Sequence, residues 1–372
     1  MEKERLEQLV NIKTGKLNAN ASDENGIYPF FTCSKETLRI NKYSYDCECV
    51  LVAGNGDLNA KYYNGKFDAY QRTYILTNKD KDKLNLKYLY YFMQNYVETL
   101  RNQSIGGVIK YIKLENLTEA KINLVSLEKQ EEIINTLQKV EEIINERKKQ
   151  IENLQMVVKS QFVEMFGELT INDKNWLMDN MGNYLTILTD FSSNGSYKTL
   201  DSQVIMYDKP NYAYMVRTTD LENDNYTDNV KYIDENSYNL LSKSKVYGNE
   251  IIMCKIGSAG KCYLMPKLNR KVSLGRNAFL FRYNDKINTI FMNYLLNTDY
   301  GKSEISKYVR GAVTKTITKD DARKIRIIVP PIELQNKFAS FVELIDKQEF
   351  EIKESLTEME NLYNSLMNEY FG

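Results

Sequence analysis

Apolar residues recur at alternating steps of four and three along two stretches of the chain, and this heptad pattern predicts two long amphipathic helices. In the first stretch they are Ile133, Leu137, Val140, Ile144, Ile151, Leu154, Val158 and Met165. In the second they are Phe338, Val342, Ile345, Ile352, Leu356, Met359, Tyr363, Leu366 and Tyr370. Because an apolar stripe of this length must be buried against another surface, we expect the two helices to pack against each other.

The two helical stretches belong to an internal repeat with a period of 205 residues. Laying Gly106–Gly167 over Gly311–Gly372 needs no gap across 62 positions, and both copies end in Phe-Gly. Thirteen positions are identical: Gly106/Gly311, Val108/Val313, Lys110/Lys315, Ile112/Ile317, Ile122/Ile327, Glu128/Glu333, Gln130/Gln335, Glu146/Glu351, Lys148/Lys353, Ser160/Ser365, Glu164/Glu369, Phe166/Phe371 and Gly167/Gly372. So long a period indicates two tandem halves of similar plan. Pseudo-twofold symmetry between such halves favours antiparallel pairing of the helices.

The segments outside the helices have the pattern of two mixed α/β regions that share a scaffold. Each has a short apolar run typical of a buried strand, followed by a glycine turn, a second strand with an arginine near its start, and an aromatic helix. The glycine turns are Gly54–Gly56 and Gly257–Gly260. We therefore predict an α+β fold with a first globular domain at 1–120, a first helix at 121–167, a second globular domain at 168–325 and a second helix at 326–372.

Composition is ordinary for a soluble globular protein, with 27% charged and 42% hydrophobic residues. No apolar run approaches the roughly 18 residues that a membrane helix requires. The N-terminal Met-Glu-Lys-Glu-Arg lacks the apolar core of a signal peptide, which predicts a cytoplasmic protein.

The types of reactive residue point away from catalysis. The chain has no histidine, which excludes Ser-His-Asp and Cys-His nucleophilic catalysis and histidine-ligated metals. Its five cysteines lack metal-finger spacing, so we expect buried thiols. Neither a phosphate-binding G-x-x-x-x-G-K-[ST] loop nor a dinucleotide fingerprint is present. These absences favour a binding protein without catalytic residues, a metal or a cofactor of its own.

Charge is balanced overall, with 50 basic and 50 acidic residues, but it is unevenly distributed. Between Glu250 and Asp285 the chain has no acidic residue and seven basic ones: Lys255, Lys261, Lys267, Arg270, Lys271, Arg276 and Arg282. Shorter acid-free stretches with several basic residues lie at 99–114 and 305–319. Such stretches predict surfaces that face phosphate groups, and ordinary solvated lysines are the alternative interpretation.

Several of these motifs together resemble the specificity subunit of type I restriction-modification systems, over nearly the whole chain. The resemblance rests on Gly54-Asn55-Gly56 followed by 69–73 (Ala-Tyr-Gln-Arg-Thr), on 256–261 followed by 273–278, on Pro330-Pro331-x-Glu333-x-Gln335, and on the Phe-Gly that closes each long helix. The first helix departs from this pattern, because Val125-Ser126 replaces the proline pair.

The resemblance implies two target-recognition domains, each of which reads one half of a split sequence in double-stranded DNA. It also implies that the long helices set the spacing between the half-sites and dock methyltransferase subunits. Two such subunits are expected. S-adenosylmethionine would be held by those partners, and ATP and Mg²⁺ would serve a further, restriction subunit that cleaves DNA.

Candidate DNA contacts follow from the donor and acceptor chemistry of side chains. Asn and Gln can pair with adenine, and Arg and Lys with guanine, which selects Asn55, Gln71, Arg72, Lys261, Arg276 and Asn277. Lys110, Tyr111, Lys113 and Lys315 adjoin the repeated glycines and are expected at phosphates. Lys61, Tyr70 and Ser258 complete the candidate set. An alternative remains open for Arg72 and Arg276, namely that these arginines brace their own domains.

Two other functions compete with DNA reading as interpretations of the sequence. A coiled-coil scaffold with two protein-binding domains and no role in DNA binding is the main alternative. A free-standing methyltransferase or nuclease fits poorly, because its sequence signatures are missing. Binding of duplex DNA that weakens steeply with salt would separate the first two interpretations.

Overall fold

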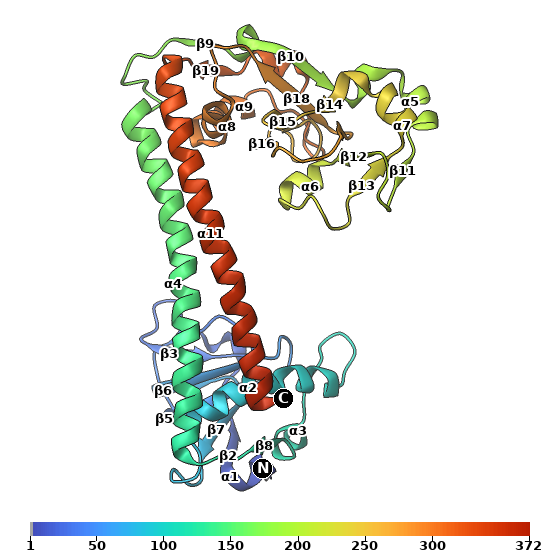
Figure 1. The fold of residues 1–372 in the computed structure, drawn as a ribbon. Helices are drawn as coiled ribbons and strands as arrows, with labels where there is room; N and C mark the ends of the chain where they lie inside the picture. The colour runs from blue at the N-terminus through green and yellow to red at the C-terminus, as the bar shows by residue number, and fades with distance from the viewer. Residues whose placement is uncertain (1–2) are drawn as a thin grey trace. The chain divides into compact units, whose positions relative to one another are not determined.

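The computed structural model describes residues 3–372 and groups them into two compact units. The first unit combines the chain up to Ile151 with Glu351–Gly372, and the second comprises Glu152–Phe350. Each unit therefore contains part of each long helix, α4 (Leu127–Phe166) and α11 (Ile332–Phe371) (Figure 1). The four-part division expected from the sequence stays a prediction. Within the described residues, no helix combines the length and apolarity needed to cross a membrane.

The first unit is built on a six-stranded sheet in the order β2-β7-β5-β6-β3-β4. The strands are β2 (Val10–Thr14), β3 (Tyr28–Phe31), β4 (Leu38–Ile40), β5 (Tyr45–Ala53), β6 (Ala60–Ala69) and β7 (Thr73–Asn78). A separate pair joins β1 (Lys3–Arg5) to β8 (Lys121–Asn123). The helices are α1 (Leu6–Leu9), α2 (Leu86–Gln103) and α3 (Leu114–Thr118).

Strand β5 shows why this apolar run forms a central strand. Its alternate residues Val50 and Val52 join the core beneath α2, while Cys49 and Leu51 pack into a smaller cluster on the other face of the sheet. Because both faces are covered, the run is continuously apolar rather than alternating. Cys49, Cys254 and Cys262 are buried as expected, whereas Cys33 and Cys47 are half-buried.

The second unit contains a four-stranded sheet in the order β10-β18-β15-β16 and a five-stranded sheet in the order β11-β13-β12-β17-β14. Its strands are β9 (Met178–Asn180), β10 (Leu185–Asp190), β11 (Met206–Tyr207), β12 (Ala213–Val216), β13 (Lys231–Ile233), β14 (Lys245–Val246), β15 (Ile251–Cys254), β16 (Cys262–Leu264), β17 (Val272–Leu274), β18 (Ala278–Tyr283) and β19 (Arg326–Ile328), with β9 paired to β19. The helices are α5 (Tyr197–Gln203), α6 (Thr218–Glu222), α7 (Glu235–Leu240), α8 (Thr289–Asn297), α9 (Asp299–Ser306) and α10 (Lys319–Arg323).

The strand ladders confirm that the two units share a scaffold. In the first, Thr14 pairs with Tyr74, which pairs in turn with Val52. The equivalent ladder of the second unit joins Asp190, Phe279 and Met253. Strands β2-β7-β5-β6 therefore correspond to β10-β18-β15-β16.

Counting along these ladders shows that the two candidate arginines occupy different positions. Gly54 donates its N–H to the carbonyl of Arg72, and Lys255 donates its N–H to the carbonyl of Asn277. Arg72 is thus equivalent to Asn277 rather than to Arg276. Arg72 directly precedes β7, whereas Asn277 stands between Arg276 and β18.

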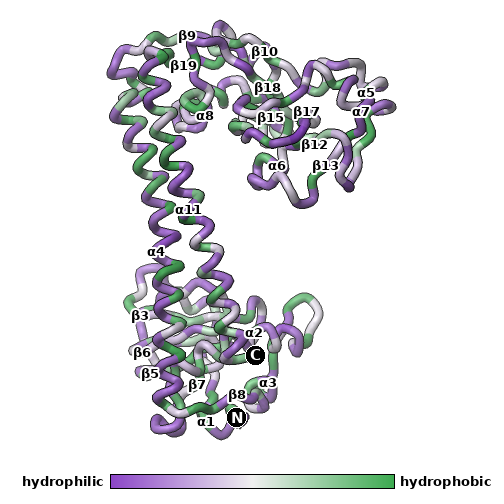
Figure 2. The backbone as a smooth tube through the Cα atoms, viewed as in Figure 1, coloured by the Kyte–Doolittle hydropathy of each residue, from purple (hydrophilic) through white to green (hydrophobic). Residues whose placement is uncertain are grey.

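Antiparallel packing of α4 and α11 is present inside each unit. In the first, the Tyr363 hydroxyl donates to Glu141 at 2.9 Å, and Lys148 pairs with Glu360 at 2.9 Å. In the second, the Phe162 and Phe338 rings lie 5.3 Å apart. Residue numbers rise along one helix as they fall along the other, which confirms the predicted direction. Apolar and polar positions alternate around both helices (Figure 2).

A buried glutamine ties each long helix to the globular part of its unit. Gln130 accepts the N–H of Asn85 at 2.8 Å and donates to the carbonyls of Lys83 and Val125 at 2.8 and 2.9 Å. Gln335 makes the same three bonds in the second unit, with Asn288 at 2.9 Å, Lys286 at 3.1 Å and Pro330 at 2.8 Å. Val125 thus supplies the same carbonyl as Pro330, and the missing proline pair does not alter this contact.

Candidate nucleic-acid interface

The turn after β5 brings several predicted DNA contacts of the first unit together. Gly54 binds the backbone of Arg72 at 2.8 Å, and Gly56 donates its N–H to the carbonyl of Lys110 at 2.9 Å. Asn55 lies between them and forms a backbone bridge with Tyr111. A side chain at Gly54 would place its Cβ 2.3 Å from the Arg72 carbonyl oxygen, so this close approach requires glycine.

Beside this turn lies an open cavity of about 330 Å³, and its wall includes Gln71 and Arg72. Both side chains are exposed, and the remaining lining residues are Thr14, Gly54, Tyr74 and Ile112. Gln71, Arg72, Asn55, Lys110 and Tyr111 therefore surround one surface region, as the hypothesis of DNA contact requires.

Three other candidates of the first unit make contacts that serve the local fold. Lys61 lies on β6 and donates to the carbonyl of Ser34 at 2.8 Å; desolvation lowers the pKa of its ammonium. Tyr70 donates its N–H to the carbonyl of Phe31 at 2.9 Å. Lys113 precedes α3, and its N–H binds the side chain of Asn116 at 2.8 Å.

The second unit has a cavity of about 400 Å³ beside its own glycine turn, at positions that do not correspond to the cavity of the first unit. Its basic lining residues are Lys261, Lys302 and Lys315, and they surround the turn at Gly260 and the glycine of the repeated loop, Gly311. Ser258 closes the turn by accepting the N–H of Lys261 at 3.1 Å. Asn277 is exposed and has a φ of 67°, a left-handed conformation that asparagine tolerates better than most residues.

Most of the acid-free basic run at 251–284 is neutralised by partners from other parts of the chain. Lys261 pairs with Glu222, and Arg282 pairs with Glu250 at 2.9 Å. Arg276 pairs with Asp201 and lies 5.0 Å from the Phe191 ring, which agrees with the bracing alternative. The run therefore does not form the unopposed basic patch that the sequence predicted.

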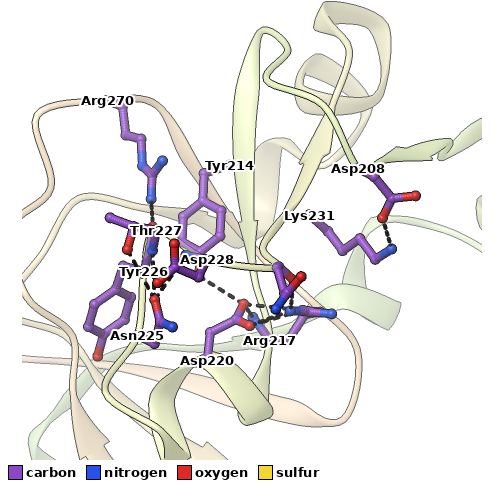
Figure 3. A network of polar contacts seen from close by, with 11 residues as sticks. Asp208, Tyr214, Arg217, Asp220, Asn225, Tyr226, Thr227, Asp228, Lys231 and Arg270 are labelled. Atoms are coloured by element: carbon purple, nitrogen blue, oxygen red, sulfur yellow. Dashed lines mark hydrogen bonds and ion pairs between the residues drawn. The ribbon is translucent and has the colours of Figure 1, made fainter. Parts of the chain in front are cut away.

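Further aromatic and polar contacts stabilise the five-stranded sheet of the second unit. Figure 3 shows Arg217 directed at Asp220, which it contacts at 2.6 Å. The hydroxyl of Tyr214 donates to the same carboxylate at 2.8 Å. Arg270 stacks 4.2 Å from the Tyr214 ring and donates to the backbone carbonyl of Tyr226. These contacts hold α6 and the following loop against β12.

One group that sequence reasoning missed surrounds the buried carboxylate of Asp190, at the end of β10. Asp190 accepts hydrogen bonds from Lys255 at 2.8 Å and Lys319 at 2.7 Å, and Ser193 donates to it at 2.7 Å. Burial alone would raise the pKa of Asp190, but these hydrogen bonds outweigh it and hold the pKa at about 2. No local signal reveals this group, because its members are far apart in the sequence.

We expect Asp190→Asn to lower the stability of the second unit at neutral pH by about 2 kcal/mol, since each pKa unit corresponds to about 1.4 kcal/mol. The folded pKa lies below the ordinary value of 3.8, so this stabilisation is complete above pH 4 and disappears as pH falls towards 2. Urea unfolding at several pH values measures it, with Asp285→Asn, an exposed aspartate, as the control. Parallel acid losses in the variant and the unchanged chain would contradict this account.

Equivalent ladder positions carry different side chains in the two units. Thr14 corresponds to Asp190, Gly54 to Lys255, and Arg72 to Asn277. The first unit consequently has an open cavity where the ladder of the second unit carries a buried ion cluster. The scaffold is repeated while the surface that it presents is not.

Comparison with known proteins agrees with this duplicated plan. The family model described as "Type I restriction modification DNA specificity domain" matches residues 1–153 and 186–360. The type I restriction enzyme EcoDI specificity subunit of Escherichia coli is 27% identical over 98% of this chain and 86% of its own. The MjaVIII specificity subunit of Methanocaldococcus jannaschii is 24% identical over 98% of this chain and 90% of its own.

Solved structures show the same fold. The S subunit of a type I restriction-modification system from M. genitalium superposes with a TM-score of 0.64 at 17% identity, covering 100% of this chain and 96% of its own. A chain from a study of complex assembly in the type I R-M system gives a TM-score of 0.56 at 12% identity, covering 100% and 97%.

Proposed function

Because the chain belongs to the type I restriction-modification DNA specificity family, we propose that its two units read the two halves of a split DNA sequence. One observation carries this proposal: the same strand ladder occurs in both units, but equivalent positions of the ladder have different side chains. A shared scaffold presents each reading surface in the same way, and divergent side chains let each surface select different bases.

The same repeat supports docking of methyltransferase subunits, one for each unit. Two copies of one partner need two like surfaces, and the long helices are the most extensive repeated elements of the chain. In this proposal the chain itself is not catalytic: methyl transfer belongs to the docked partners, and a restriction subunit is a further partner.

Electrostatic contact with phosphates gives the proposal a direct test. We expect the full chain to bind duplex DNA, with an association constant that falls steeply as salt rises, because each neutralised phosphate releases counterions. In the double variant Lys110→Gln with Lys315→Gln, the slope of log affinity against log salt is expected to become shallower by about 2. Fluorescence anisotropy of a labelled duplex at several salt concentrations measures this slope.

The matched control is Lys139→Gln with Lys337→Gln, which removes two exposed lysines from the long helices. This control is expected to leave the slope unchanged. If the unchanged chain shows no salt-sensitive binding to any duplex, the alternative of a coiled-coil scaffold without a DNA role takes its place.

A further inference from the structure

Two short hairpins, residues 104–112 and 309–317, occupy equivalent places in the two units. In the first, Ile105 and Tyr111 exchange backbone hydrogen bonds of 3.0 and 2.9 Å. Arg310 and Thr316 do the same in the second, at 2.9 and 2.8 Å. Each hairpin is also bound to the glycine turn of its unit, because Gly56 contacts Lys110 and Gly257 donates to the carbonyl of Lys315, both at 2.9 Å.

Glycine shapes both loops in the same way. Gly106 and Gly311 have φ values of 115° and 106°, which side-chain-bearing residues rarely adopt. A Cβ at Gly106 would lie 2.6 Å from the Ile109 carbonyl oxygen, and one at Gly311 would lie 2.2 Å from that of Thr314. The backbone therefore turns tightly at each loop, and its conformation is specified by the sequence.

The tip of each hairpin is an apolar side chain in full contact with solvent. Val108 is 103% exposed and Val313 is 98% exposed. Four of the thirteen identities in the internal repeat fall within these seven positions, Gly106–Ile112 and Gly311–Ile317. Glycine is needed for the turn, and Ile112 and Ile317 are buried. The fold gives no reason for two identical exposed valines.

The lysine of each hairpin differs from most basic residues of the acid-free run at 251–284. Lys255, Lys261, Arg276 and Arg282 all have carboxylate partners. Across residues 3–372, neither Lys110 nor Lys315 has an ion-pair partner, and both are exposed. An identical valine next to an unpaired lysine, in both units, fits a ligand that is apolar at one point and anionic nearby.

We propose that the two hairpins are sequence-independent wedges that enter a groove of duplex DNA. Val108 and Val313 contact sugars and base edges inside the groove, while Lys110 and Lys315 contact the flanking phosphates. Because the hairpins are alike in two units that read different sequences, their contacts are common to both half-sites and carry no sequence information. This inference rests on the proposed function. It adds Val108 and Val313, which the pairing preferences between side chains and bases do not select.

The test is the double variant Val108→Ser with Val313→Ser in the full chain, measured with labelled duplexes of several unrelated sequences. We expect roughly tenfold weaker binding to every duplex, because apolar surface is no longer removed from water. The slope of affinity against salt is expected to stay unchanged, since no phosphate contact is lost. The lysine variants above change that slope instead.

The matched control is Ile27→Ser with Ile171→Ser, one exposed apolar residue in each unit outside the hairpins, at 69% and 74% exposure. This control is expected to bind DNA as the unchanged chain does, and thermal unfolding is expected to be unaltered in both double variants. Normal DNA affinity of the valine variant overturns the inference while leaving the proposed function intact. If the valine variant keeps normal DNA affinity but no longer binds methyltransferase, the inference is overturned as well, because the hairpins would then be a contact for that protein. Weaker binding to one duplex sequence only also overturns it.

Discussion

Exchanging residues 168–325 for the matching segment of a related specificity subunit is expected to change one half of the methylated DNA sequence and leave the other half unchanged. The reason lies in the division of the chain: the four-stranded and five-stranded sheets of the second unit, and all loops between them, fall within this segment. The first unit's sheet and its cavity at Arg72 are untouched.

The segment contacts the retained chain partly through the backbone and partly through the rings of Phe291 and Tyr294, which pack on Phe162 and Phe338 of the long helices. Gln335 binds the N–H of residue 288 and the carbonyl of residue 286, and β19 pairs with β9, whatever side chains are present. The buried cluster of Asp190, Lys255 and Lys319 lies wholly inside the segment and moves as a unit.

Mapping methylated adenines across the genome of cells that express each chimera, together with its methyltransferase, measures the outcome. The matched chimera, with residues 1–120 exchanged, is expected to change the other half of the sequence. A change in both halves from a single exchange would refute separate reading by the two units.

The long helices and the duplication could be predicted from the sequence, because their signals are local and regular. The heptad positions Ile133, Leu137 and Val140 are buried as expected, and both heptad stretches lie within the long helices α4 and α11. The turns after the two central strands could be predicted as well, because Gly54 and Gly257 come shortly after apolar runs.

The electrostatics of the second unit could not be predicted in the same way. Ion pairs form between residues that are distant in the chain, such as Arg276 with Asp201 and Lys255 with Asp190, so an acid-free stretch says little about net charge in space. Nor does the sequence distinguish a buried valine from an exposed one, so it marks Val108 and Val313 only as identical positions of the repeat. Whether Asn55, Gln71 and Arg72 contact bases stays a prediction.

We expect Gln130→Met to destabilise the first unit by about 3 kcal/mol or more, because it leaves one N–H and two carbonyl groups without partners. Gln130 is fully buried, and methionine has nearly the same shape, so the variant removes the hydrogen bonds without creating a large cavity. The backbone N–H that loses its partner belongs to Asn85. The side chain of Asn85 caps α2 by accepting the N–H of Lys87 at 2.9 Å. Loss of the bond therefore weakens the start of α2 as well as its attachment to α4.

Gln335→Met is expected to have the same effect in the second unit, at Asn288 and the start of α8. Thermal unfolding gives the size of each effect, and hydrogen exchange locates it, with faster exchange of the amide of residue 85 in one variant and of residue 288 in the other. Gln150→Met and Gln348→Met change exposed glutamines of the same two helices and are expected to be close to neutral. If the Gln130 and Gln335 variants are as stable as these controls, the two glutamines only fill space, and their hydrogen bonds do not attach the long helices to the globular parts of the units. If either single variant speeds hydrogen exchange at both residue 85 and residue 288, the two units do not unfold independently.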